Sequence, residues 1–152
     1  MEYLIRDFQE DDIDDLIQLC AKHAAHELSD YDETGKAARL KNALLSSTPP
    51  LHCWIVEVNE LIVGYATFTF DFSTWNACRY LHVDCIYIED NFRGRGIGAV
   101  IMNRLKNVAR ENGCVNVQWQ TPVFNKKAIR FYEKINARGL DKKRFYIDIE
   151  EQ

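Results

Sequence analysis

The fold is decided by one stretch of sequence, Asp84-Cys85-Ile86-Tyr87-Ile88-Glu89-Asp90-Asn91-Phe92-Arg93-Gly94-Arg95-Gly96-Ile97-Gly98. It joins an apolar, β-branched run that ends at Ile88 to an amphipathic helix that begins after Gly96. Glycines at the start of a helix leave backbone N–H groups unshielded at the positive end of the helix dipole. Arg93 and Arg95 flank this spot and can add charge-assisted hydrogen bonds. The turn therefore predicts an anion site that suits a phosphate.

A glycine-rich turn alone is weak evidence for a ligand, because glycines also serve tight turns and close helix packing. The stretch does not follow the GxGxxG pattern with a later acidic ribose ligand. It also lacks the Gly-Lys-Ser/Thr ending of a P-loop. Dinucleotide and nucleoside-triphosphate binding therefore fit the sequence poorly.

Length and composition predict a single domain over residues 1–152, since 152 residues with 47% hydrophobic content can bury a sizeable core. The first residues lack the pattern of a signal peptide, and no run of about 18 apolar residues appears, so we expect a cytoplasmic protein with no membrane partner. Five cysteines without a CxxC pair fit a reducing compartment. The net charge of -4 argues against the binding of nucleic acid. The histidines show no spacing typical of metal ligands, so we expect no metal site.

Hydrophobic periodicity gives the order of elements along the chain. Strands are predicted at residues 3–7, 53–58, 61–70, 79–88, 115–119 and 144–149. Helices are predicted at residues 11–26, about 37–45, 97–112 and 126–135. Successive strands in the middle predict an antiparallel meander, and the later alternation of strand and helix predicts at least one parallel pair. The fold class is α+β (mixed α/β).

Two blocks of this sequence resemble the GNAT N-acetyltransferase superfamily. The stretch from Asp84 to Gly98 is similar to its central motif, which reads Arg or Gln, two residues, Gly, one residue, Gly or Ala. The block from Asn125 to Ala137 resembles the later helix of the family, although Asn136 stands where Gly is usual. Asn is the next most tolerant residue of a left-handed backbone, so the turn can survive. The implied fold has a central twisted mixed sheet with a splayed parallel pair.

A third block resembles one branch of this superfamily, the spermidine/spermine and thialysine N-acetyltransferases. It is the turn Asp71-Phe72-Ser73-Thr74-Trp75-Asn76. The resemblance implies acetyl-CoA as cofactor, coenzyme A as product, no metal, and direct attack by an amine in a ternary complex. It assigns the following residues to the cofactor: Ile86, Tyr87, Ile88, Arg93, Gly94, Arg95, Gly96, Ile97, Gly98, Ala99 and Asn125.

Acetyl transfer to an amine requires loss of a proton from nitrogen and an acid for the departing thiolate, since aliphatic amines are protonated at neutral pH. Tyr132 matches the tyrosine that many superfamily members use as this acid; its other interpretation is a core aromatic. Asp84 is the base candidate, because it interrupts an apolar strand on the predicted face of Ile86, where we expect partial desolvation. The alternative is a structural pair with His82 or Arg79.

The loop after the first helix is rich in acidic residues. In the superfamily that this chain resembles, this region usually forms a wall of the acceptor site. We predict that Glu27, Asp30 and Tyr31 attract an ammonium group, with Trp75 as a further contact for substrate or partner. A solvated acidic loop is the other interpretation. His23 is expected on a solvated helix face.

Three functions remain open on the sequence alone. The first is acetylation of a small cationic amine, either a polyamine or a diamino acid. The second is acetylation of a macromolecular amine, such as a protein amino terminus or an aminoacyl-tRNA. The third is a non-catalytic acyl-CoA-binding module. The resemblance further implies a homodimer.

Overall fold

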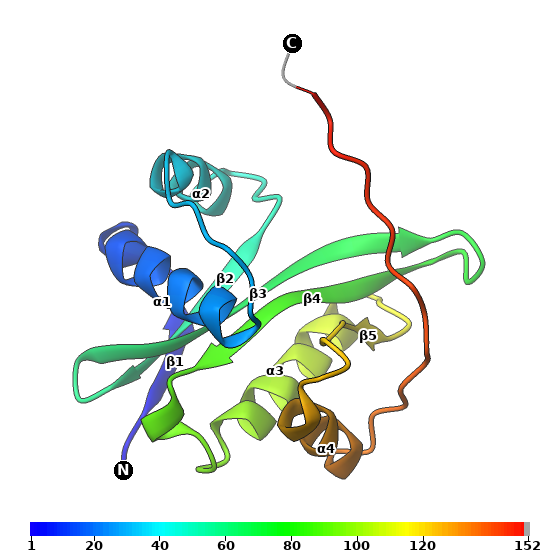
Figure 1. The fold of residues 1–152 in the computed structure, drawn as a ribbon. Helices are drawn as coiled ribbons and strands as arrows, with labels where there is room; N and C mark the ends of the chain where they lie inside the picture. Colours follow the sequence, from blue (N-terminus) through cyan, green and yellow to red (C-terminus); the bar gives the residue numbers. More distant parts are fainter. Residues whose placement is uncertain (151–152) are drawn as a thin grey trace. The chain divides into compact units, whose positions relative to one another are not determined.

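The computed structural model describes residues 1–150, which fall into two compact units. The first unit, Met1–Gln120, contains the sheet and three α-helices. The second begins at Thr121 and contains one α-helix among its described residues. Figure 1 traces both along the chain.

The sheet of the first unit has five strands in sequence order. They are β1 (Leu4–Asp7), β2 (His52–Val58), β3 (Leu61–Ser73), β4 (Cys78–Ile88) and β5 (Val117–Gln118). The first four pair antiparallel, and β4 pairs with β5 in parallel. The predicted meander, the parallel pair and the α+β class are confirmed. Asn59 and Glu60 form the β2–β3 turn with positive φ angles of 50° and 65°.

Three α-helices belong to the first unit: α1 (Ile13–His26), α2 (Lys36–Leu44) and α3 (Ile97–Glu111). Helix α1 buries its apolar side in a cluster with Leu16 and Ile55 at its centre. Trp54, which precedes Ile55 in β2, points the other way, since side chains alternate along a strand. Its ring centre lies 4.6 Å from the Arg104 guanidinium of α3. Helices α1 and α3 therefore cover opposite faces of the sheet.

A β-bulge interrupts β4 in the middle of the sheet. Thr67 lies opposite Cys85 while the next residue, Phe68, lies opposite Val83, so Asp84 is an extra residue in β4. Such a bulge shifts the alternation of side chains by one residue. The prediction that Asp84 shares one face with His82 and the later isoleucines is therefore wrong, because His82 and Ile86 face opposite sides.

The second unit contains α4 (Lys126–Lys134), which lies where the sequence predicts it. The Asn125 side-chain oxygen accepts a hydrogen bond from the Ala128 N–H at 3.3 Å and caps the helix. After the helix Asn136 adopts a φ of 64°. The left-handed turn therefore survives without glycine, as expected.

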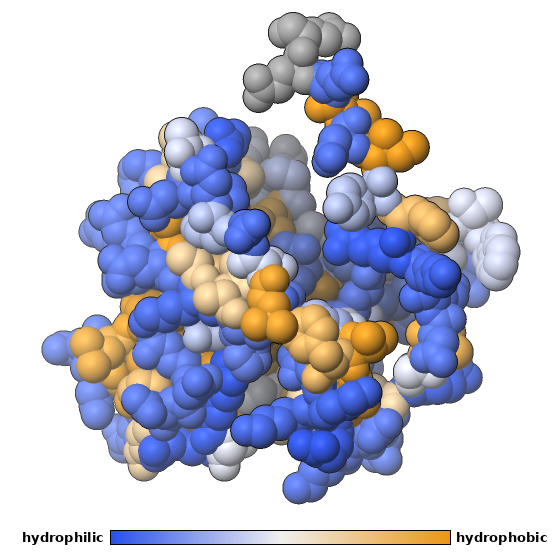
Figure 2. Space-filling model, viewed as in Figure 1, coloured by the Kyte–Doolittle hydropathy of each residue, from blue (hydrophilic) through white to orange (hydrophobic). Residues whose placement is uncertain are grey.

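The strand predicted at residues 144–149 is not formed. Phe145, Ile147 and Ile149 alternate as a strand would require, yet they are 86%, 90% and 90% exposed. Figure 2 shows apolar atoms in orange along this segment, just before the grey terminal residues. A strand needs a neighbour for its backbone N–H and C=O groups, and apolar alternation in the sequence does not supply one.

Candidate active site

The turn before α3 is open to solvent on its outer side. Gly94 and Gly96 have φ angles of 72° and 83°, and a Cβ placed on either would meet no atom within 4 Å. Helix α3 begins at Ile97 without a side-chain cap and without an acidic residue in its first turn. Its first N–H groups therefore lack a side-chain acceptor, and an anion can approach them closely. This geometry fits the pyrophosphate of a nucleotide cofactor.

The two arginines of the turn differ in their surroundings. Arg93 donates from Nε to the Ile88 carbonyl at 2.6 Å and pairs with Asp90 at 2.7 Å. Its guanidinium also lies 5.2 Å from the Tyr87 ring centre. Arg95 is exposed and donates a long hydrogen bond, 3.3 Å, to the Asn91 carbonyl. Arg93 thus braces the turn, and Arg95 is the more available cation.

The outer edge of β4 is only partly covered within the first unit. Strand β5 pairs with β4 at Leu81 and His82 and ends at Gln118. It does not extend along residues 83–88, which include Ile86, Tyr87 and Ile88 of the predicted cofactor site. This is the splayed parallel pair that the sequence resemblance implies.

Asp84 lies where β5 has ended, and its side chain is exposed. The partial desolvation expected from the sequence is therefore absent, because the bulge turns the residue out of the alternation. The carboxylate accepts a long hydrogen bond from the Cys85 thiol at 3.6 Å. Among residues 1–150 it makes no ion pair with His82 or Arg79, the two partners considered for a structural role.

The prediction that His23 lies on a solvated helix face is wrong, because the side chain is half-buried against β3 and β4. Its Nδ1 lies 2.8 Å from the Tyr65 hydroxyl, and its ring stacks on Tyr87 with centroids 5.2 Å apart. Burial lowers the His23 pKa, and Glu27, 3.3 Å from Nε2, opposes this only in part. His23 is therefore neutral at pH 7. Its position seven residues after Leu16 is the signal that places it on the buried stripe.

The thiols near Asp84 are not nucleophiles at neutral pH. Burial raises the Cys85 pKa to about 12, and the Asp84 charge contributes. Burial likewise raises the pKa of Cys20. A thiolate is the reactive form of cysteine, so neither residue suits a covalent acyl-enzyme. All five cysteines of the chain are free.

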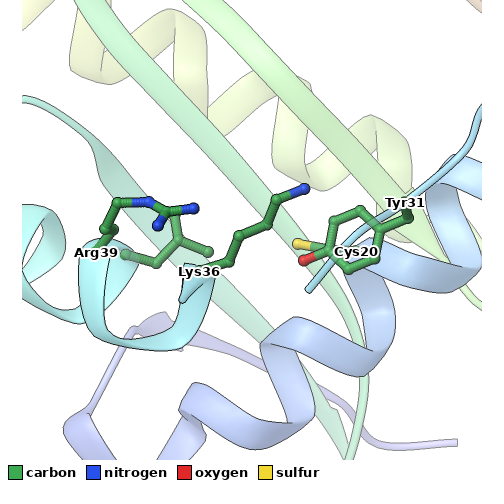
Figure 3. A pocket seen from close by; sticks show the side chains of 5 residues that line it. Cys20, Tyr31, Lys36 and Arg39 are labelled. Carbon is green, nitrogen blue, oxygen red and sulfur yellow. The ribbon is translucent and has the colours of Figure 1, made fainter. Parts of the chain in front are cut away.

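A cavity of about 330 Å³ lies between α1, α2 and the loop that joins them. It is lined by Cys20, Tyr31, Lys36, Arg39 and Leu40, as Figure 3 shows. The Lys36 ammonium lies 4.0 Å from the centre of the Tyr31 ring, so this aromatic face already holds a cation. Tyr31 is predicted from the sequence, but Lys36 and Arg39 are not, since no local pattern shows that these two residues of α2 line the cavity.

The other predicted acceptor residues are spread over the first unit. Glu27 follows α1 and its carboxylate lies 3.3 Å from His23 Nε2, whereas Asp30 is exposed. Trp75 lies in the β3–β4 turn and is 97% exposed. At about 3.3 Å per residue, this turn lies roughly 25 Å along β3 from Tyr65. The structure therefore does not bring Trp75 together with the α1–α2 segment.

Tyr132 and Asn125 belong to the second unit. Asn125 uses its side-chain oxygen to cap α4, and the Tyr132 ring lies 5.3 Å from that of Phe131. Within residues 1–150 there is no group of three or more His, Cys, Asp or Glu residues that could hold a metal ion. No helix in the same range is both long and apolar enough to span a bilayer.

Comparison with known families identifies the fold. The model of the acetyltransferase (GNAT) family matches residues 7–137. The chain belongs to this family. It is thus an acetyl-CoA-dependent N-acetyltransferase, and the resemblance noted in the sequence is confirmed.

This GNAT chain is similar to two relatives and to one solved structure. It is 30% identical over 146 residues to thialysine N-epsilon-acetyltransferase of Bos taurus, covering 90% of this chain and 85% of that protein. It is 28% identical over 149 residues to spermidine/spermine N(1)-acetyltransferase-like protein 1 of Homo sapiens, covering 92% of this chain and 21% of that protein. A possible acetyltransferase from Clostridium difficile 630 shares the fold, with a TM-score of 0.82 and 20% identity over 99% of this chain and all of that one.

Proposed function

We propose that this N-acetyltransferase acetylates a small cationic amine, either a polyamine or a diamino acid, by direct attack in a ternary complex. The observation that carries the proposal is an exposed, unpaired carboxylate, Asp84, at the point where β5 leaves the edge of β4. The names of the relatives, a thialysine and a spermidine/spermine-like acetyltransferase, support an acceptor of this class.

The cofactor would supply an acetyl group activated as a thioester. Backbone N–H groups from Gly94 to Ala99 would hold its pyrophosphate, because the turn is open and the helix start is uncapped. Backbone groups of residues 86–88 would hold the pantetheine arm along the uncovered edge of β4. Arg93, Arg95 and Asn125 complete the proposed set.

Two side chains would move the protons. Asp84 would accept the proton that the acceptor ammonium must lose before its nitrogen can attack. Tyr132 would donate its hydroxyl proton to the departing thiolate. The raised pKa of the Cys20 and Cys85 thiols supports direct attack over an acyl-enzyme, since both stay protonated.

Glu27, Asp30, Tyr31 and Trp75 are proposed to contact the acceptor. The first three follow one another around the end of α1, near the cavity that Tyr31 lines. Trp75, distant from them along β3, would instead contact the acceptor at a partner subunit.

The test is release of free thiol from acetyl-CoA in the presence of a panel of diamines, polyamines, diamino acids and peptides. We expect thiol release that depends on a small amine. Turnover on peptide amino termini alone would favour a protein acetyltransferase. Thermal stabilisation by acetyl-CoA with no transfer to any amine would favour the non-catalytic module.

We further infer that the chain acts as one catalytic domain over residues 1–152, as a homodimer in the cytoplasm. Five free thiols support a reducing compartment. The exposed segment at residues 144–149 supports a dimer, because its apolar side chains, which lie open to solvent, offer surface that a second copy can cover. Sedimentation of the full chain and of residues 1–143 tests the assembly, and a monomeric full chain would contradict it.

A further inference from the structure

We propose that a second cavity, at the start of β2 between the end of β1 and the end of α3, binds a small organic ammonium ion. The occupant that fits is an alkylated or quaternary ammonium, whose charge is surrounded by methyl or methylene groups. The site lies apart from the turn before α3 and from Asp84. The inference therefore goes beyond the proposed function and does not depend on it.

The cavity exists because β1 ends before it has covered the whole of β2. The last pair between these strands is Asp7 with Trp54. The next residue, Phe8, donates its N–H to the Cys53 carbonyl at 3.0 Å, which leaves His52 without a partner in β1. A cavity of about 370 Å³ opens at this place. Its volume lies within the range of small-molecule sites, which begins at about 300 Å³.

Aromatic rings form much of the cavity wall. Trp54 and Phe68 are buried, whereas His52 and Phe70 are half-buried. The His52 ring stacks on Phe68 with centroids 5.1 Å apart and meets Phe70 edge-on at 5.5 Å. Trp54 lies 4.9 Å from Phe68, again centre to centre. Ring faces carry partial negative charge, and clustered rings are the usual recognition element for quaternary ammonium ions.

Two of these rings already contact a cation of the protein. The Arg104 guanidinium lies 4.6 Å from the Trp54 ring centre, and the Arg79 guanidinium lies 4.8 Å from that of Phe70. Neither arginine lines the cavity, and among its described lining residues there is no lysine or arginine. The ring cluster thus accommodates positive charge at its border, while its cavity side is left to a ligand.

Asp7 is the charged side chain of the cavity, and it lacks a counter-ion. Within residues 1–150 no Lys, Arg or His nitrogen lies within 4.0 Å of its carboxylate. Burial lowers the pKa of His52, and Asp7 opposes this only in part, so His52 is neutral at pH 7. Val108 and Asn112 add the C-terminal end of α3, where the helix dipole is negative. This combination favours a cation and disfavours a carboxylate or a phosphate.

The cavity and the turn before α3 lie at opposite ends of the same helix. From Ile97 to Val108, at about 1.5 Å per residue, the distance along α3 is roughly 16 Å. The cavity also lies beside β2, whereas Asp84 belongs to β4, with β3 between the two strands. An ammonium ion bound here is therefore not the acceptor in the act of transfer.

The experiment titrates choline into the ¹⁵N-labelled full-length protein, without acetyl-CoA, and follows amide resonances by NMR. The matched probes are 3,3-dimethylbutan-1-ol, which has the same shape without the charge, and 3,3-dimethylbutanoate, which has the opposite charge. A cation–π contact and one ion pair together correspond to about tenfold in affinity. We expect choline to bind about tenfold more tightly than the alcohol, and the carboxylate not to bind. The resonances that shift should be those of residues 7, 52, 54 and 112.

Two variants and one control locate the charge and the rings. Asp7→Asn should weaken choline binding about fivefold and leave the alcohol unaffected. Phe70→Leu keeps an apolar side chain but removes a ring, and it should weaken choline binding about threefold. Asp11→Asn is the matched control, because Asp11 is also exposed and lies four residues from Asp7, yet does not line the cavity. It should bind choline as the wild-type protein does.

Three results would overturn the site. The first is equal affinity for choline and the alcohol in the wild-type protein, which decides the matter even if a variant fails to fold. The second is choline-dependent shifts centred on Asp84 and residues 94–99, or no shifts at all. The third is an Asp11→Asn protein that loses as much affinity as Asp7→Asn. Since no acetyl-CoA is present, none of these results bears on the proposed function, which acetyl transfer tests separately.

Discussion

The turn before α3 and the region around α2 present different chemical groups to a ligand. The turn offers backbone N–H groups, exposed because Gly94 and Gly96 take positive φ angles and carry no side chain. The region around α2 offers side chains: the cationic Lys36 and Arg39 on α2 and the neutral Tyr31 ring on the loop before it. A site made of backbone tolerates few substitutions, whereas a site made of side chains can change its ligand residue by residue.

The largest expected effect is on the acetyl transfer step itself. We expect Tyr132→Phe to lower kcat about 1000-fold, within the usual range for loss of a general acid, with the dissociation constant for coenzyme A unchanged. Tyr146→Phe is the control, because Tyr146 is also in the second unit and is 80% exposed. Initial rates and calorimetry measure both. A Tyr132→Phe protein with full rate would remove Tyr132 from the reaction.

The next largest effect is expected at Asp84, the proposed general base. We expect Asp84→Asn to lower kcat/KM about 100-fold at pH 7. The deficit should shrink as the pH rises toward the pKa of the free amine, where solvent alone leaves more of it unprotonated. Asp71→Asn, an exposed carboxylate in the same hairpin, should keep the wild-type profile. A deficit that does not depend on pH would indicate a structural role for Asp84.

A smaller effect distinguishes cofactor binding by the turn before α3 from the contribution of its glycines to stability. Gly96 and Gly113 both have positive φ angles and open space beside them, at opposite ends of α3. Alanine at either should cost about 1 kcal/mol of stability through backbone strain. We expect only Gly96→Ala to weaken coenzyme A binding as well, by about tenfold. Equal affinity in the two variants would show that the turn does not hold the cofactor.

The smallest effect concerns His23, which lies between the α1–α2 segment and the sheet. Its pKa is lowered chiefly by burial, so below about pH 6.5 the unfolded chain binds a proton that the folded chain does not. Stability should therefore fall as the pH drops below this value and be retained above it. His23→Gln should lose part of this dependence in melts between pH 5 and 8; the rest comes from His52, whose pKa burial also lowers. An unchanged slope would contradict the burial of a neutral His23.

Local signals explain what the sequence predicts correctly. The strand that ends at Ile88, the glycines and the apolar stripe of α3 are all contained in a few neighbouring residues, so the order of elements and the turn are predicted. Asn125 and Asn136 likewise act on their own helix. Periodicity also places β2, β3 and β4, because the two turns between them are short.

Contacts between distant segments explain what the sequence does not predict. The bulge at Asp84 exists only in the register between β3 and β4, so alternation gave the wrong face and the wrong exposure. The place of Lys36 beside the Tyr31 ring depends on how the loop between α1 and α2 folds back on α2. The apolar alternation at residues 144–149 predicted a strand, but a strand needs a neighbour that the pattern itself does not specify.

The most direct test of the central claim is a competition experiment. Lysine, cadaverine, spermidine and a peptide with a free amino terminus are mixed at equal concentration with acetyl-CoA and the purified protein, and early products are quantified by mass spectrometry. We expect one of the acetylated small amines, lysine, cadaverine or spermidine, to predominate over acetylated peptide. Acetylated peptide as the main product, or no acetylated amine at all, would contradict a small-amine acetyltransferase.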